Sequence, residues 1–348
     1  MRSDDAGRVR ALVLQGGGAL GAFELGVARV LYRERAWRPD VVAGVSIGAI
    51  TAALLARPKG GDPLAALEAF WREVTVDAPL APGPLKAYAS VFGNPHFFMP
   101  RTDVWSLPWW TSLYTVGALR ETLAGLIDED ALADPRAHPA ILVTATDVAA
   151  GEIAAFYSGE GGLTLDHLLA SGSLPPYFPA TTIGQRAYWD GGLFDNTPLG
   201  AVLDHLDPSG ERRDEREIVV VNLFPNAGAP PANLGEVSQR ALNLIFANKT
   251  ASDLRLLERF NAVAGLFDTI REDPRWADLA ASPAFTAADQ GYIQVPNVIT
   301  VTRKEAVDAG ASGDFSPATI AARAKEGEHA AREAFAAKNR PKPRLVAA

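Results

Sequence analysis

The sequence predicts a three-layer α/β/α fold, in which helices cover both faces of a mainly parallel central sheet. Short apolar runs typical of buried strands alternate with runs of helical periodicity. The first three predicted elements are a strand at residues 10–14, a helix at 21–34 and a strand at 40–43. Two strands joined by a crossover helix form the βαβ unit of a parallel sheet. On that helix we expect Phe23 and Val27 to face the core and Glu24 to face solvent.

The same alternation is predicted to continue along the rest of the chain. Four further apolar runs are predicted strands: residues 140–145, 153–157, 217–224 and 297–302. Residues 181–183 and 186–189 flank Gly184-Gln185 and are expected to form a hairpin.

We expect one catalytic core at residues 8–205, with an insertion rich in aromatic residues and proline at residues 79–115. Residues 206–337 are predicted to supply the remaining sheet strands and a C-terminal helical extension packed on the core. Residues 338–348 contain two prolines and are expected to form a flexible tail.

Composition excludes several kinds of site and partner. The chain has 348 residues and a net charge of -8, which disfavours a polyanionic partner such as nucleic acid. It has no cysteine, which excludes disulfides, thiolate catalysis and cysteine-based zinc sites. The five histidines lack metal-binding spacing, so we expect no metal and no other cofactor. No signal peptide or membrane span is evident, so a cytoplasmic protein is expected. The sequence carries no indication of oligomeric state.

The pentapeptide Gly44-Val45-Ser46-Ile47-Gly48 matches the G-x-S-x-G pattern of a nucleophile elbow. It lies between a predicted strand and a run of helix-forming residues, which is the context that the motif requires. A sharp turn between the two elements exposes the serine hydroxyl, and the flanking glycines allow close backbone packing. Ser46 is therefore the candidate nucleophile.

A glycine loop at Gly16, Gly17 and Gly18 follows the first strand, and Gly21 completes a G-x-G-x-x-G pattern. This pattern also occurs at dinucleotide sites, but those need an acidic residue about 20 positions further on, at the end of the second strand. That strand here leads into Ser46 instead. The interpretation we favour is an oxyanion hole made of free backbone amides, and a nucleotide-binding module is the alternative.

The base that activates Ser46 is predicted to be Asp190. It ends a predicted strand and precedes Gly191 and Gly192, which let the chain turn away and leave the carboxylate facing a cavity. A carboxylate in a partly desolvated site can accept the serine proton directly. His205 and His329 lie in charged segments typical of the surface and are weaker candidates.

In their order and spacing, these motifs resemble the patatin-like phospholipase family over about residues 11–199. The glycines that support the likeness are Gly21, Gly44, Gly48, Gly191 and Gly192. The resemblance implies a patatin-like fold and a bacterial serine acyl hydrolase with a Ser46–Asp190 dyad and no metal. It also implies that the substrates are phospholipids, lysophospholipids, acylglycerols or other fatty esters. An acyltransferase that uses the same acyl-Ser46 intermediate is an alternative.

One departure from the family pattern concerns the oxyanion hole. Many members carry Lys or Arg where this chain has Leu20, so stabilisation of the oxyanion must come from backbone donors.

The predicted insertion is unusually rich in large aromatic side chains. Those of interest are Phe97, Phe98, Trp105, Trp109 and Trp110. A proline-stiffened segment packed on the sheet is one interpretation. The other is a wall or lid of an acyl pocket, or a patch that makes transient contact with a membrane surface.

Overall fold

The computed structural model describes residues 8–77, 92–206, 215–225, 227, 230–290, 294–304 and 310–338. Residues 79–91 of the predicted insertion and 339–348 of the predicted tail lie outside this part of the chain. Lys338, the first residue of that tail, is instead the last residue of a helix and pairs with Glu217.

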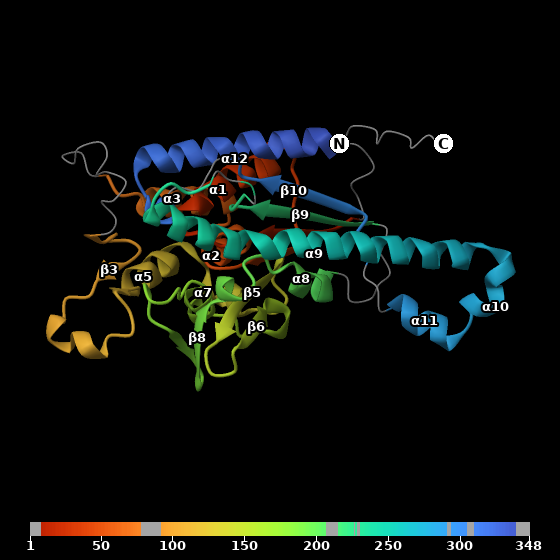
Figure 1. Cartoon of the computed structure of the whole chain (residues 1–348), viewed down its shortest axis with the longest axis horizontal. Helices are drawn as coiled ribbons and strands as arrows, with labels where there is room; N and C mark the ends of the chain where they lie inside the picture. Colours follow the sequence, from red (N-terminus) through yellow and green to blue (C-terminus); the bar gives the residue numbers. More distant parts are fainter. Residues whose placement is uncertain are drawn as a thin grey trace.

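A central sheet of eight strands runs through the molecule (Figure 1). Five parallel strands lie in the order β10 (Asn297–Thr302), β9 (Arg216–Asn222), β1 (Val9–Leu14), β2 (Val41–Gly44) and β5 (Ala140–Asp147). Three antiparallel strands extend the β5 side: β6 (Glu152–Tyr157), β8 (Arg186–Asp190) and β7 (Thr181–Ile183). Each predicted strand is present, and the predicted hairpin is β7–β8.

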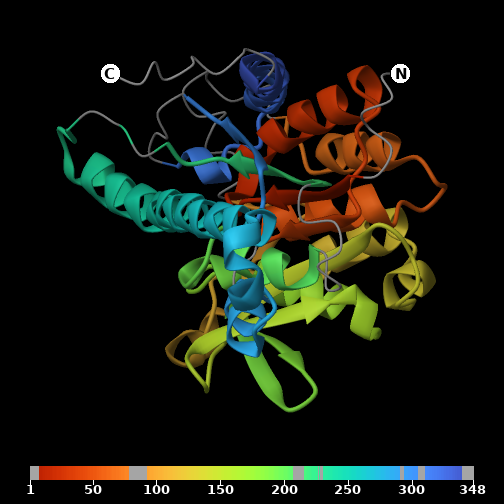
Figure 2. The same cartoon turned by 90° about the vertical axis from the view of Figure 1, so that its right-hand side faces the viewer.

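Helices cover both faces of this sheet, as Figures 1 and 2 show. Strand side chains such as Leu12 and Leu14 pack under one layer, whereas Ala11 and Val13 pack under the other. The first layer contains α1 (Ala22–Arg29), α2 (Ile47–Ala56), α3 (Pro63–Glu73) and α12 (Pro317–Lys338). The second contains α8 (Leu199–Leu206) and the long α9 (Leu234–Glu272). The three-layer α/β/α architecture is therefore present.

Smaller elements complete the described part of the chain. They are the hairpin β3 (Met99–Pro100) and β4 (Tyr114–Thr115), then α5 (Gly117–Leu126), α6 (Glu129–Ala133), α7 (Leu165–Ser171), α10 (Ala277–Ala280) and α11 (Pro283–Gln290). Single turns of 3₁₀ helix include η2 (Gly18–Gly21), η5 (Val104–Trp109), η7 (Gly191–Leu193), η9 (Pro274–Trp276) and η10 (Ala311–Gly313). None of the helices among these residues has both the length and the apolar character needed to cross a bilayer.

The prediction that Glu24 faces solvent was wrong. Glu24 is buried on α1, where the Thr51 hydroxyl of α2 donates a 2.7 Å hydrogen bond to its carboxyl group. Burial raises the pKa of Glu24 to about 8, so its neutral form is favoured. The physical reason is that α2 packs against α1 and supplies the buried Thr51 hydroxyl as a partner for Glu24.

Candidate active site

Ser46 occupies a strained turn between β2 and α2. Its backbone has φ 56° and ψ -122°, a left-handed conformation that is rare for a residue with a side chain. The two motif glycines make this turn sterically possible. A Cβ at Gly44 would lie 2.2 Å from the Gly48 carbonyl oxygen, and one at Gly48 would lie 2.5 Å from that of Leu14. These contacts are those of a nucleophile elbow.

Asp190 ends β8, which pairs with β5 at residues 145–147, just beyond the residues 140–143 that pair with β2. Only 3% of its surface is exposed, and its Oδ1 accepts a 2.8 Å hydrogen bond from the Gly192 amide. The Ser46 hydroxyl lies close enough to this carboxyl group to lower its pKa. Burial raises the pKa of Asp190 to about 7, although the Gly192 amide and the Ser46 hydroxyl oppose that rise. The two candidate catalytic side chains therefore lie near each other.

The glycine loop lies against the elbow. A Cβ at Gly16 would be 3.0 Å from the Ser46 Cβ, and Gly18 has φ 57°. The amides of Gly16, Gly17 and Gly18 donate no hydrogen bond to any residue that the structure describes. Leu20 is buried, so no cationic side chain enters the loop from that position. Free amides beside a serine hydroxyl are suited to hold a developing oxyanion.

Comparison with known protein families identifies this arrangement. The family model described as "Patatin-like phospholipase" matches residues 12–203, which is more than half of the chain. The chain belongs to the patatin-like phospholipase family. This family comprises lipid acyl hydrolases, and the matched region includes Ser46, Asp190 and the glycine loop.

Among solved structures, this patatin-like phospholipase is similar to VipD from Legionella pneumophila, with 16% sequence identity and a TM-score of 0.43. The similarity covers 95% of this chain and 67% of VipD. No curated protein matches the sequence.

Sequence reasoning assigned no role to two polar side chains that position the site of this patatin-like phospholipase. The Ser171 hydroxyl accepts a 2.9 Å hydrogen bond from the Ser46 amide and donates one of 2.7 Å to the Thr144 carbonyl oxygen. The Asn196 side-chain amide donates a 3.0 Å bond to the Gly16 carbonyl oxygen. Both bonds link segments far apart in the sequence, so no local pattern could have revealed them.

The two histidines that were weaker candidates for the base make other contacts. His205 stacks on Tyr157 at 4.1 Å between ring centroids, and His329 pairs with Glu333. Asp147 accepts bonds from two amides of its own turn and pairs with Arg186. No cluster of three or more potential metal ligands occurs within the described ranges.

The five aromatic residues of the insertion fall into two groups. Phe97 and Phe98 are buried, and their rings lie 5.4 Å and 5.5 Å from those of Phe315 and Phe178, respectively. Trp110 is half-buried, whereas Trp105 and Trp109 are each 78% exposed. The phenylalanines thus pack the insertion onto the core, and two of the tryptophans point away from it.

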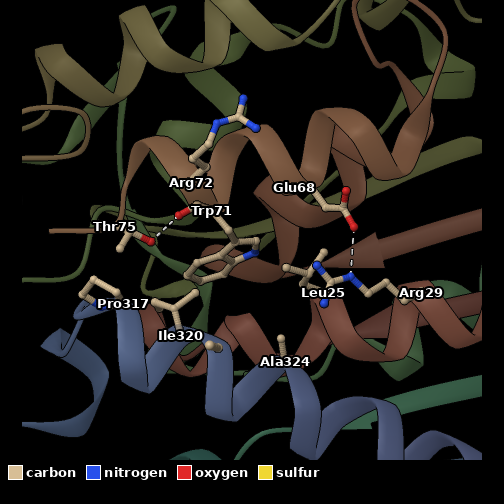
Figure 3. Close-up of a pocket in the computed structure, with 10 residues that line it drawn as sticks. Leu25, Arg29, Glu68, Trp71, Arg72, Thr75, Pro317, Ile320 and Ala324 are labelled. Atoms are coloured by element: carbon tan, nitrogen blue, oxygen red, sulfur yellow. Dashed lines mark hydrogen bonds and ion pairs between the residues drawn. The ribbon is translucent and has the colours of Figure 1, made fainter. Parts of the chain in front are cut away.

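A separate cavity of about 410 Å³ lies between α1, α3 and α12 (Figure 3). Its lining includes Leu25, Trp71, Arg72 and Ile320, but neither Ser46 nor Asp190. The Trp71 indole nitrogen is buried without a hydrogen-bond partner. This cavity is therefore distinct from the candidate active site of the patatin-like phospholipase.

Proposed function

We propose that the chain is a serine lipid-acyl hydrolase of the phospholipase A, lysophospholipase or carboxylesterase type, with Ser46 as nucleophile and Asp190 as general base. The observation that carries the proposal is the proximity of these two side chains, beside glycine-loop amides that donate no hydrogen bond within the described part of the chain. Membership of the patatin-like phospholipase family supports the substrate class.

Acylation starts when the Asp190 carboxylate accepts the Ser46 proton and Ser46 Oγ attacks the ester carbonyl carbon. The carbonyl oxygen becomes an oxyanion, which the amides around Gly17 and Gly18 stabilise. A preorganised donor of this kind contributes about 3 kcal/mol to the transition state. The intermediate then collapses: the bond to the alkoxy oxygen breaks, and Asp190 returns the proton to the departing alcohol.

Deacylation uses the same groups in the second half of the cycle. Asp190 accepts a proton from water, and the resulting hydroxide attacks the acyl carbon of acyl-Ser46. Collapse of the second tetrahedral intermediate releases the fatty acid and restores the Ser46 hydroxyl. A buried carboxylate can perform both proton transfers because its pKa, raised to about 7, lies near the operating pH.

The test compares Ser46→Ala and Asp190→Asn with the unmodified enzyme on a short-chain aryl ester. We expect each variant to lose at least about 10³-fold in kcat, because either change removes a proton-transfer or nucleophilic step. Asp147→Asn is the matched control, since it replaces another poorly exposed aspartate whose contacts lie outside the dyad. A fluorophosphonate should label Ser46 in the unmodified enzyme only. Near-normal turnover by folded Ser46→Ala or Asp190→Asn would refute the dyad.

A further inference from the structure

Four large apolar side chains on the 3₁₀ turn η5 are held in solvent. They are Val104, Trp105, Leu107 and Trp109, and both tryptophans are 78% exposed. Exposed leucines are common on protein surfaces, but two exposed indoles within five residues are not. A surface of this kind indicates an apolar binding partner.

The turn does not depend on these side chains for its shape. Arg101 pairs with Asp103 through two hydrogen bonds, and the Ser106 hydroxyl bonds to the Asp103 carbonyl oxygen at 2.9 Å. The Trp110 indole donates to Ser106 at 2.9 Å, and Arg101 lies over its ring. Polar contacts and the inward-facing Trp110 therefore fix the turn, which leaves Trp105 and Trp109 available for a partner.

Main-chain bonds connect this turn to the candidate active site. The amides of Leu113 and Tyr114 donate hydrogen bonds to the Tyr177 carbonyl oxygen. Four residues before Tyr177, the carbonyl oxygen of Ser173 accepts a hydrogen bond from the Asp190 amide. Leu113, Tyr177 and Phe194 are themselves exposed. Phe194 follows Asp190 by only four residues, so an exposed apolar side chain also lies on the segment that carries Asp190.

The overall arrangement places this surface on one end of the molecule. In Figure 1, the β9 and β10 arrows point toward the end where β3 and the orange turn of η5 lie. In a parallel α/β sheet the carboxyl ends of the strands carry the site, and Ser46 follows such an end. The helices α10 and α11 lie at the opposite end.

We propose that Val104, Trp105, Leu107 and Trp109, together with Leu113, Tyr177 and Phe194, form a docking face for a phospholipid bilayer. The inference rests on the proposed function, because a lipid-acyl hydrolase must draw its substrate from an assembled lipid surface. Indole rings suit this position because they are apolar bodies with one polar N–H group, and they locate at the headgroup boundary.

Charge indicates which bilayer the face fits. Arg101 is the only Lys or Arg between residues 92 and 115, and it is neutralised by Asp103. The whole chain carries a net charge of -8. Attraction to anionic lipids therefore adds little, and docking depends on apolar burial at a zwitterionic surface.

The first experiment measures binding to phosphatidylcholine vesicles by flotation, in the Ser46→Ala background so that no lipid is consumed. Burial of about 100 Å² of apolar surface per indole at ~25 cal/mol per Å² makes each tryptophan worth roughly 50-fold in partitioning. We expect Trp105→Ser with Trp109→Ser to weaken binding at least about 100-fold. Trp276→Ser is the matched control, because Trp276 is 51% exposed on η9, which adjoins α10 at the opposite end. It should bind as well as the parent.

Three results would overturn the docking face: no vesicle binding by the parent protein, an equal loss in Trp276→Ser, or unchanged binding in the double variant. A second measurement, in the active enzyme, separates this inference from the proposed function. The double variant should hydrolyse a water-soluble short-chain ester normally and vesicle lipid at least tenfold more slowly. Vesicle binding without turnover of either ester would refute the proposed function and leave the docking face intact.

Discussion

Asp190→Asn is expected to make the protein more stable while it abolishes activity. The carboxyl group is buried, and among the described residues the Gly192 amide and the nearby Ser46 hydroxyl compensate for its lost hydration. Asparagine keeps an oxygen that can accept the Gly192 bond but carries no charge. The substitution therefore removes the cost of ionising a buried carboxyl group and little else.

The magnitude follows from the pKa of Asp190, which burial raises from 3.8 to about 7. Between these two values the unfolded chain has released its proton and the folded chain has not, so the free energy of unfolding falls as pH rises. The slope is about 1.4 kcal/mol per pH unit, which gives a total of about 4 kcal/mol above pH 7. Asp190→Asn has no carboxyl group to ionise, so its free energy of unfolding does not fall in this way. Its stability relative to the parent should therefore increase from pH 5 to pH 8.

Urea unfolding at pH 5, 6.5 and 8 measures the effect. We expect the advantage of Asp190→Asn to grow by about 2–3 kcal/mol across this range and then to level off. Asp147→Asn provides a control of opposite sign, because the Ala150 amide and Arg186 hold the pKa of Asp147 below its usual value. That variant should be destabilised at pH 8. A pH-independent difference between Asp190→Asn and the parent would refute the reasoning.

Three further predictions concern the same region. The kcat/KM for a short-chain ester should fall about tenfold per pH unit below about pH 7 as the pKa of Asp190 is crossed; a flat profile down to pH 5 would exclude Asp190 as the base. Ser171→Ala should lower kcat at least tenfold with little change in KM, because it frees the Ser46 amide and the Thr144 carbonyl oxygen, whereas Ser173→Ala, which touches neither, should not. Glu24→Gln should flatten the fall in stability between pH 4.5 and 8, since the pKa of Glu24 is raised to about 8; parallel curves in urea titrations would contradict this.

The fold was predictable because each strand of the sheet is encoded locally. The β10 strand lies at the predicted residues, β1 begins one residue earlier than predicted, and β2 is shifted by one residue at both ends. A strand buried on both faces must be apolar along its whole length, and that signal needs no knowledge of partners. The β7–β8 hairpin was likewise predictable from its own two turn residues, Gly184 and Gln185.

Features that depend on distant segments were not predictable in this way. Periodicity placed Glu24 on the solvent side of its helix, but α2, which follows the next strand in the chain, brings Thr51 to that side. The catalytic roles of Ser46 and Asp190 remain predictions. Ser171 and Asn196 were not predicted, because a serine at a helix end and an asparagine in a loop have no distinctive local pattern. Their roles exist only once β5 and the glycine loop are beside them.

The proximity of Ser46 and Asp190 depends on the reversal of strand direction after β5. Because β8 runs antiparallel to β5, its last residue, Asp190, pairs with Ala145. This pair lies near the carboxyl end of β2, which Ser46 follows. The strand must end there, and Gly191 allows this: a Cβ at that position would lie 2.6 Å from the Thr144 carbonyl oxygen. Thr144 is also the acceptor of the Ser171 hydroxyl that holds the Ser46 amide. One backbone segment of β5 therefore positions both residues of the proposed dyad, so a shift of β5 would disturb the proposed nucleophile and base together.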